Sequence, residues 1–258
     1  MKRIFIAFVI SIVGFLLISG IVVKTLTDPI FTKLGIRDTN VLWIQFDCAA
    51  SENCVFGAPR MENLSIIRAL TSGDQIIVAE EALDYTKSYF KSDAFLIKYE
   101  KERQAHKPKV AELNQETREM YEMQLAEYRE MYTPEVLDML PEEAKAGALY
   151  ELKRMEAALD GNMDPEDRKN WEFRYPAEPN DLLIRSIKDF LEITKDVDFN
   201  ATTKLNPKNN HQVFTNPVYE KKDTQWKACF RAGMELTNFV RAYSQDWLSE
   251  LERQKKNG

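Results

Sequence analysis

A run of twenty uncharged and mostly apolar residues at positions 4–23, IFIAFVISIVGFLLISGIVV, constrains this chain more than any other feature. At a rise of about 1.5 Å per residue, a helix of this length reaches about 30 Å, the thickness of a bilayer's hydrocarbon core. Because lipid offers no partners to backbone polar groups, a crossing segment must be helical. Lys2 and Arg3 come before the run, and basic residues favour the cytoplasmic side. The sequence therefore predicts a single-pass cell-membrane protein with a cytoplasmic N-terminus and an extracytoplasmic remainder, periplasmic in a Gram-negative cell.

The alternative interpretation of the same run is a cleaved signal peptide. The apolar region of a signal peptide spans about 7–15 residues and ends at an A-x-A-like site. Here the run is longer, and Gly20 near its end has Ile18 two positions before it. These features favour a retained anchor, and both interpretations export the rest of the chain. We divide the chain into an anchor or signal at 1–24, an irregular juxtamembrane region at 25–60 and a helical domain at 61–258.

The charge of the exported part bears on its partners. Of the 35 basic residues, Lys2 and Arg3 precede the apolar run, which leaves 33 basic against 41 acidic residues beyond it. Binding to nucleic acid depends on basic side chains that neutralise phosphates. The acidic balance therefore predicts no nucleic-acid partner.

Helical periodicity dominates the rest of the chain. With only nine Gly and ten Pro, the composition favours long helices over turn-rich β structure. Helix starts and stops are marked at Lys107-Pro108, Thr133-Pro134 and Asp160-Gly161. The predicted helices cover residues 61–70, 75–106, 110–132, 141–159, 181–194 and 223–253. The sequence thus predicts an all-α fold, a transmembrane helix followed by a bundle of about five or six helices, with at most a minor short strand near 41–46.

The last of these helices has the most regular pattern. Its apolar positions step by three and four residues, which is heptad spacing, and we expect this face to pack inside its own domain. Phe230 and Met234 are expected to widen the face. The positions on the face are Trp226, Cys229, Gly233, Leu236, Val240, Tyr243 and Trp247.

The chain has three cysteines. Cys48 and Cys54 are close enough in sequence to close a small loop in an oxidising compartment, and we predict a disulfide between them. Cys229 lies among apolar residues of the last predicted helix and is expected to be a buried free thiol.

Catalytic and metal-binding motifs are scarce. His106 and His211 are the only histidines, and one Glu102–His106 pair at i, i+4 is too few ligands for a metal. Asp160, Asn162 and Asp164 resemble the start of a calcium loop, but Pro165 replaces its glycine and Trp171 its final glutamate, so we expect a helix end followed by a helix start. The sequence predicts no catalytic residue, no cofactor and no metal, and leans against an enzyme without deciding the question.

The C-terminal residues 214–251 resemble the corresponding part of a group of bacterial envelope proteins that have no known activity. The residues that carry the resemblance are Asn216-Pro217, Tyr219-Glu220, Trp226-Lys227, Cys229 to Gly233 and Trp247, together with the charged helix that breaks at Lys107-Pro108. The resemblance implies a membrane-anchored helical protein of a bacterium and implies no chemistry.

Three functions are compatible with these sequence patterns. The leading one is a membrane-anchored protein that acts through protein–protein interaction on helical surfaces, with a protein partner and with the membrane bound through residues 4–23. The second is a domain that binds a small ligand or a cell-wall component in a pocket lined by Trp171, Trp226, Trp247 and Tyr243. The third is an enzyme of unfamiliar type.

Overall fold

The computed structural model describes residues 42–43, 46, 72–110, 112–207 and 212–257. The predicted anchor at 4–23, the predicted helix at 61–70 and the predicted Cys48–Cys54 disulfide lie outside the described residues. Among the residues that are described, no helix combines the length and the apolar character that a membrane crossing requires.

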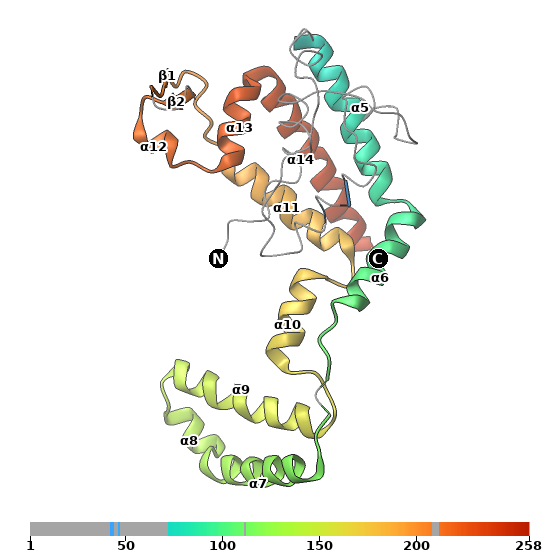
Figure 1. The fold of residues 1–258 in the computed structure, drawn as a ribbon, viewed down its shortest axis with the longest axis vertical. Coiled ribbons are helices and arrows are strands. Elements are labelled where there is room, and N and C mark those ends of the chain that lie inside the picture. Colours follow the sequence, from blue (N-terminus) through green and yellow to red (C-terminus); the bar gives the residue numbers. More distant parts are fainter. Residues whose placement is uncertain (1–41, 44–45, 47–71, 111, 208–211, 258) are drawn as a thin grey trace. The chain divides into compact units, whose positions relative to one another are not determined.

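The described residues are mostly helical, with ten helices and one two-stranded sheet (Figure 1). The all-α prediction is confirmed. Helices are more numerous than the predicted five or six, partly because two long predicted helices are each broken in two. The short strand predicted near 41–46 is wrong where the structure describes it, since Leu42 and Trp43 are helical. The chain divides into two compact units, unit 1 from residues 1–97 and 178–258 and unit 2 from residues 98–177.

Unit 1 is built around its last helix, α14 (Met234–Asn257), which packs on α5 (Ser72–Phe90), α11 (Pro179–Ile193) and α13 (Thr224–Ala232). Figure 1 shows α14 lying between α5 and α11. On α11 the buried stripe consists of Leu182, Leu183, Ser186, Ile187 and Phe190. The buried side of α14 carries Leu236, Val240, Ser244, Trp247 and Leu251, which step by four, four, three and four residues. This spacing keeps one side chain per turn against the neighbouring helices.

The helix predicted at 75–106 is two helices, α5 and α6 (Asp93–Ala105). The chain turns at Lys91 and Ser92, where the Ser92 hydroxyl accepts a hydrogen bond of 3.2 Å from the Phe95 backbone N–H. The turn brings the Phe90 and Phe95 rings edge to face, with centroids 4.9 Å apart. Both rings are buried, so the break places two aromatic side chains in one core where a straight helix would separate them.

Gly233 divides the helix predicted at 223–253 into α13 and α14. Its φ of 88° and ψ of 163° belong to a region that is essentially restricted to glycine. The heptad face is therefore not continuous. Beyond the break the register shifts, and Met234, predicted to be buried, is 60% exposed while Ser244 is fully buried.

Residues 196–222, which show no helical period, contain a small hairpin that the sequence patterns did not predict. Strand β1 (Thr203–Leu205) pairs antiparallel with β2 (Gln212–Phe214), with Thr203 opposite Phe214. The short helix α12 (Pro217–Glu220) follows, and the Glu220 carboxylate accepts a 2.8 Å hydrogen bond from the Phe214 N–H. Phe214 is buried against Trp226, whose indole N–H donates to the Asp196 carboxylate over 3.0 Å. The hairpin is thus held on unit 1 by its aromatic end.

Unit 2 contains α7 (Gln115–Met131), α8 (Pro134–Met139), α9 (Glu142–Leu159) and α10 (Pro165–Arg174). Three of the four starts have a side-chain cap on the backbone, from Asn114, Thr133 and Asp164. The predicted start at Thr133-Pro134 and the predicted end at Asp160-Gly161 are confirmed. Helix α7 packs on α9 through a narrow stripe on which Leu125 is buried and Tyr128 half-buried.

Unit 2 closes where the C-terminal half of α6 meets α10 and the residues after it. The Trp171 indole N–H donates to the Arg103 carbonyl over 2.9 Å, and the Arg103 guanidinium lies 4.3 Å from the centre of the Trp171 ring. The Tyr99 hydroxyl donates to the Pro176 carbonyl over 2.6 Å. A buried indole with a satisfied N–H and a stacked cation joins the two ends of this unit.

We expect Gly233→Ala to destabilise unit 1 by about 1–3 kcal/mol, because alanine is strained at this backbone conformation. Gly147→Ala is the matched control, since an added Cβ meets nothing within 4 Å at either glycine and Gly147 lies inside an exposed stretch of α9. The control should stabilise by about 0.5–1 kcal/mol through helix propensity. Thermal and urea denaturation followed by circular dichroism measure both. An unchanged or raised stability of Gly233→Ala would contradict a glycine-dependent break between α13 and α14.

Candidate functional site

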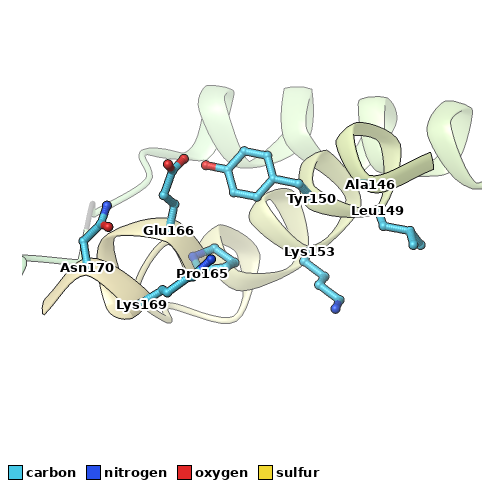
Figure 2. A pocket seen from close by; sticks show the side chains of 8 residues that line it. All are labelled: Ala146, Leu149, Tyr150, Lys153, Pro165, Glu166, Lys169 and Asn170. Atoms are coloured by element: carbon cyan, nitrogen blue, oxygen red, sulfur yellow. The ribbon is translucent and has the colours of Figure 1, made fainter. Parts of the chain in front are cut away.

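A shallow groove on unit 2 lies between α9 and α10 (Figure 2). It encloses about 550 Å³ and is lined by Ala146, Leu149, Tyr150, Lys153, Pro165, Glu166, Lys169 and Asn170. The Tyr150 hydroxyl donates weakly to the Asp164 carboxylate, 3.3 Å from the nearer oxygen. Asp164 also caps α10 by accepting from the Glu166 N–H over 2.8 Å. Burial, and then the charge of Asp164, raises the pKa of Tyr150.

The groove offers two ammonium groups and one carboxylate to a ligand. Lys153 comes from α9, while Glu166 and Lys169 come from the first turns of α10, and all three are exposed. In Figure 2, Tyr150 and Glu166 lie toward one side of the groove, and Lys153 lies apart from them. Side chains that are solvated in this way bind an anion weakly, because water competes for each of them.

The four aromatic residues proposed as one pocket have separate structural roles. Trp226 and Trp247 belong to the interior of unit 1, with exposed fractions of 0% and 2%. Tyr243 donates its hydroxyl proton to the Asp84 carboxylate over 2.5 Å, which joins α14 to α5. Trp171 lies in unit 2 beneath Arg103. Burial places the two tryptophans of unit 1 in a structural core and leaves no ligand-facing surface on them.

The candidate metal ligands also have local structural roles. The His106 ring pairs through Nδ1 with the Glu102 carbonyl over 2.9 Å and stacks on Tyr175, with ring centroids 4.8 Å apart. Asp160 ends α9 and Asp164 caps α10, as expected for a helix end followed by a helix start. Within the described part of the chain, no group of three or more His, Cys, Asp or Glu is placed to hold a metal ion.

The strongest carboxylate perturbation lies at the contact between α5 and α14. Glu250 forms ion pairs with Lys87 and, over 2.8 Å, with Lys91. The Lys87 ammonium, followed by that of Lys91, lowers the pKa of Glu250 to about 2. Burial, followed by the hydrogen bond to Asp84, raises the pKa of Tyr243 above its usual value. Side chains with shifted pKa values mark functional sites in many proteins, but here the paired groups connect α5 to α14 along an exposed edge.

A surface on α7 and α8, which we call the acidic methionine face, was not predicted from the sequence. It consists of Glu116, Glu119, Met120, Met123, Glu127, Glu130 and Met131 of α7, and Met139 of the following helix α8 is exposed as well. The four methionine side chains are 43–77% exposed. The chain has nine methionines, and six of them lie in unit 2, where Met155 and Met163 are buried in the core. Unit 2 therefore exposes most of its methionine side chains.

A sequence signal for this face existed in the local charge. Residues 112–143 contain ten carboxylates and only two basic residues, Arg118 and Arg129. The net charge of the whole chain does not reveal this acidic segment, because the residues outside unit 2 carry equal numbers of acidic and basic groups. Comparison of the chain with protein-family models, curated proteins and solved structures gives no match.

Glu250 should make stability depend on pH. Its folded pKa of about 2 lies below the unfolded value of about 4.3, so its contribution is present above pH 4.3 and is lost as pH falls toward 2. Glu250→Gln should therefore lower the melting temperature at pH 7, and the difference from the wild-type chain should vanish near pH 2. Asp246→Asn, at an exposed position in the middle of the same helix, is the control and should leave the melting temperature unchanged at both pH values. A difference that persists at pH 2 would mean that packing, and not the ion pairs, is responsible.

Thiol labelling should separate the three cysteines. Cys229 is buried, and burial raises the pKa of its thiol to about 12, so we expect no labelling in the folded chain. If Cys48 and Cys54 are bonded, denaturation without a reductant should expose one thiol per chain, and denaturation with a reductant three. Mass spectrometry after alkylation counts the labels. Three labels without a reductant would exclude the disulfide.

Proposed function

We propose that this chain is a membrane-anchored interaction protein. Residues 4–23 would hold it in the membrane with the N-terminus in the cytoplasm, and the helical units would meet a protein partner on the other side. The twenty-residue uncharged run after Lys2 and Arg3 supports the anchor. The exposed surface of unit 2 supports the binding role.

The observation that carries the binding role is the exposure of methionine on α7 and α8. Met123 and Met131 are 60% and 58% exposed, and Met139 on α8 is 77% exposed. Single exposed apolar residues are ordinary, but several on one short stretch of helix mark an interaction surface. Methionine suits this role because its unbranched, polarizable side chain adapts to the shape of a partner. A helix face is also a common unit of protein recognition.

Binding of a small ligand is the second candidate function, and the groove between α9 and α10 is the observation that favours it. Its volume of about 550 Å³ falls in the range of known ligand pockets. Such pockets bury most of the ligand's surface, whereas this groove is open and its charged side chains are exposed. The acidic methionine face therefore supports protein binding better than the groove supports ligand binding.

Site-specific photo-cross-linking tests the proposal on the full-length chain in the membranes of cells that make it. A photo-reactive amino acid replaces Met123 in one variant and Met234 of α14 in the control, two methionines with the same exposed fraction of 60%. The membranes are irradiated first and then washed with alkaline carbonate, which removes proteins that neither span the bilayer nor are cross-linked to one that does. We expect the chain to stay in the membrane and to form a discrete protein adduct from position 123 and none from position 234.

Two results would contradict the proposal separately. Release of the chain into the carbonate wash would refute the anchor. Absence of an adduct at position 123, or equal adducts at both positions, would refute binding through unit 2.

A further inference from the structure

The net charge of the chain is concentrated in unit 2. This unit carries nineteen acidic and thirteen basic residues, a net charge of −6, which equals the net charge of the whole chain. Within it, residues 112–143 alone carry a net charge of −8. The segment that is most negative is therefore also the one that exposes the methionines.

On α7 the exposed methionines and glutamates share one side of the helix. At 100° per residue, Glu116, Glu119, Met120, Met123, Glu127, Glu130 and Met131 fall within about 120° of arc. The buried stripe around Leu125 lies on the other side, toward α9. All seven side chains are exposed. This side of α7 therefore presents apolar side chains interspersed with carboxylates.

Both basic residues of α7 lie off this side and are engaged elsewhere. Arg129 forms an ion pair with Glu156 over 2.8 Å, and Arg118 donates to the Leu159 carbonyl over 2.8 Å. Among the described residues, Glu116, Glu119, Glu127 and Glu130 make no ion pair. Their carboxylates are solvated, so a cationic partner would meet no competing positive charge on this face.

We propose that the acidic methionine face binds a cationic amphipathic segment of a partner protein, with lysine or arginine side chains opposite the glutamates and apolar side chains over Met120, Met123 and Met131. This inference rests on the proposed function and adds the chemistry of the partner and the helix that receives it. The charge determines the choice of occupant. A second copy of this face, an anionic lipid surface and a nucleic acid would each bring like charge against the glutamates.

The two components of the face should affect binding differently. A partner that covers the methionines removes their apolar surface from water, and this slows dissociation. The carboxylates attract a cationic partner during the encounter, and salt at physiological concentration screens this attraction over about 8 Å. Loss of the methionines should therefore weaken binding at every salt concentration. Loss of the carboxylates should remove most of the dependence on salt.

The test uses the full-length chain in detergent and a fluorescent peptide of eighteen residues built from Lys and Leu, with Leu at helical spacing. A Glu and Leu peptide of the same pattern is the charge control. We expect the Lys peptide to bind and the Glu peptide not to bind. A variant that combines Met120→Ser, Met123→Ser and Met131→Ser should raise the Kd about tenfold or more. A variant that combines Glu119→Gln, Glu127→Gln and Glu130→Gln should reduce the dependence of the Kd on salt concentration. Met234→Ser and Glu235→Gln on α14 form the matched control and should leave the Kd unchanged.

Each contrary result has a distinct meaning. Equal binding of the Lys peptide by the methionine variant and by the wild-type chain would overturn this surface. A dimer of the wild-type chain that the methionine variant abolishes, measured by analytical ultracentrifugation, would assign the face to a second copy and overturn the cationic partner. If the photo-cross-linked partner is retained by the methionine variant, the proposed function stands and this inference fails. If no partner is cross-linked but the wild-type chain still binds the Lys peptide more tightly than the methionine variant does, the surface stands and the proposed function fails.

Discussion

Trp247, in the middle of α14, lies nearly parallel to Phe90 of α5 with ring centroids 6.3 Å apart, and only 2% of its surface is exposed. This contact organises unit 1, because Phe90 also meets Phe95 across the turn that ends α5. The polar contacts between Asp84 and Tyr243 and between Lys87 and Glu250 then follow the same pair of helices along their exposed edge. The aromatic contact supplies the buried area, and the polar contacts fix the register in which the two helices meet.

Unit 2 is stabilised by fewer buried side chains. Its closure depends on Trp171, which is buried under Arg103 and donates to the carbonyl of the same residue. Helix α7 contributes only one buried side chain, Leu125, and leaves Met123 exposed. A helix that buries one narrow stripe is free to vary the rest of its surface without loss of the fold. Helix α7 thus carries a stripe that folds the unit and a separate exposed face, and this arrangement supports the proposal that α7 carries the binding surface.

The sequence predicted what is local and missed what depends on contacts between distant residues. Thr133-Pro134 and Asp160-Gly161 mark a helix start and a helix end through cap and turn chemistry, and the structure has both. The break at Gly233 was missed because apolar spacing continues across it, and only a backbone conformation reserved for glycine reveals it. The hairpin of β1 and β2 was missed because strands of three residues carry no periodic signal, and their position depends on Phe214 reaching Trp226. The tryptophans of unit 1, which the sequence placed in a ligand pocket, are enclosed by their own core for the same reason.

The acidic methionine face shows how charge and apolar surface together narrow the kind of partner. Methionine alone would permit association with another copy of the chain or with lipid, and carboxylates alone would describe a solvated helix surface. Both kinds of side chain lie on one side of α7, and Arg118 and Arg129 are directed to contacts with α9. This arrangement disfavours an anionic occupant and leaves apolar surface for a partner to cover. The same carboxylates keep this surface soluble when no partner is bound, because like charges on two copies repel. The proposed cationic amphipathic segment would satisfy both components at once, and such selectivity would require no preformed pocket.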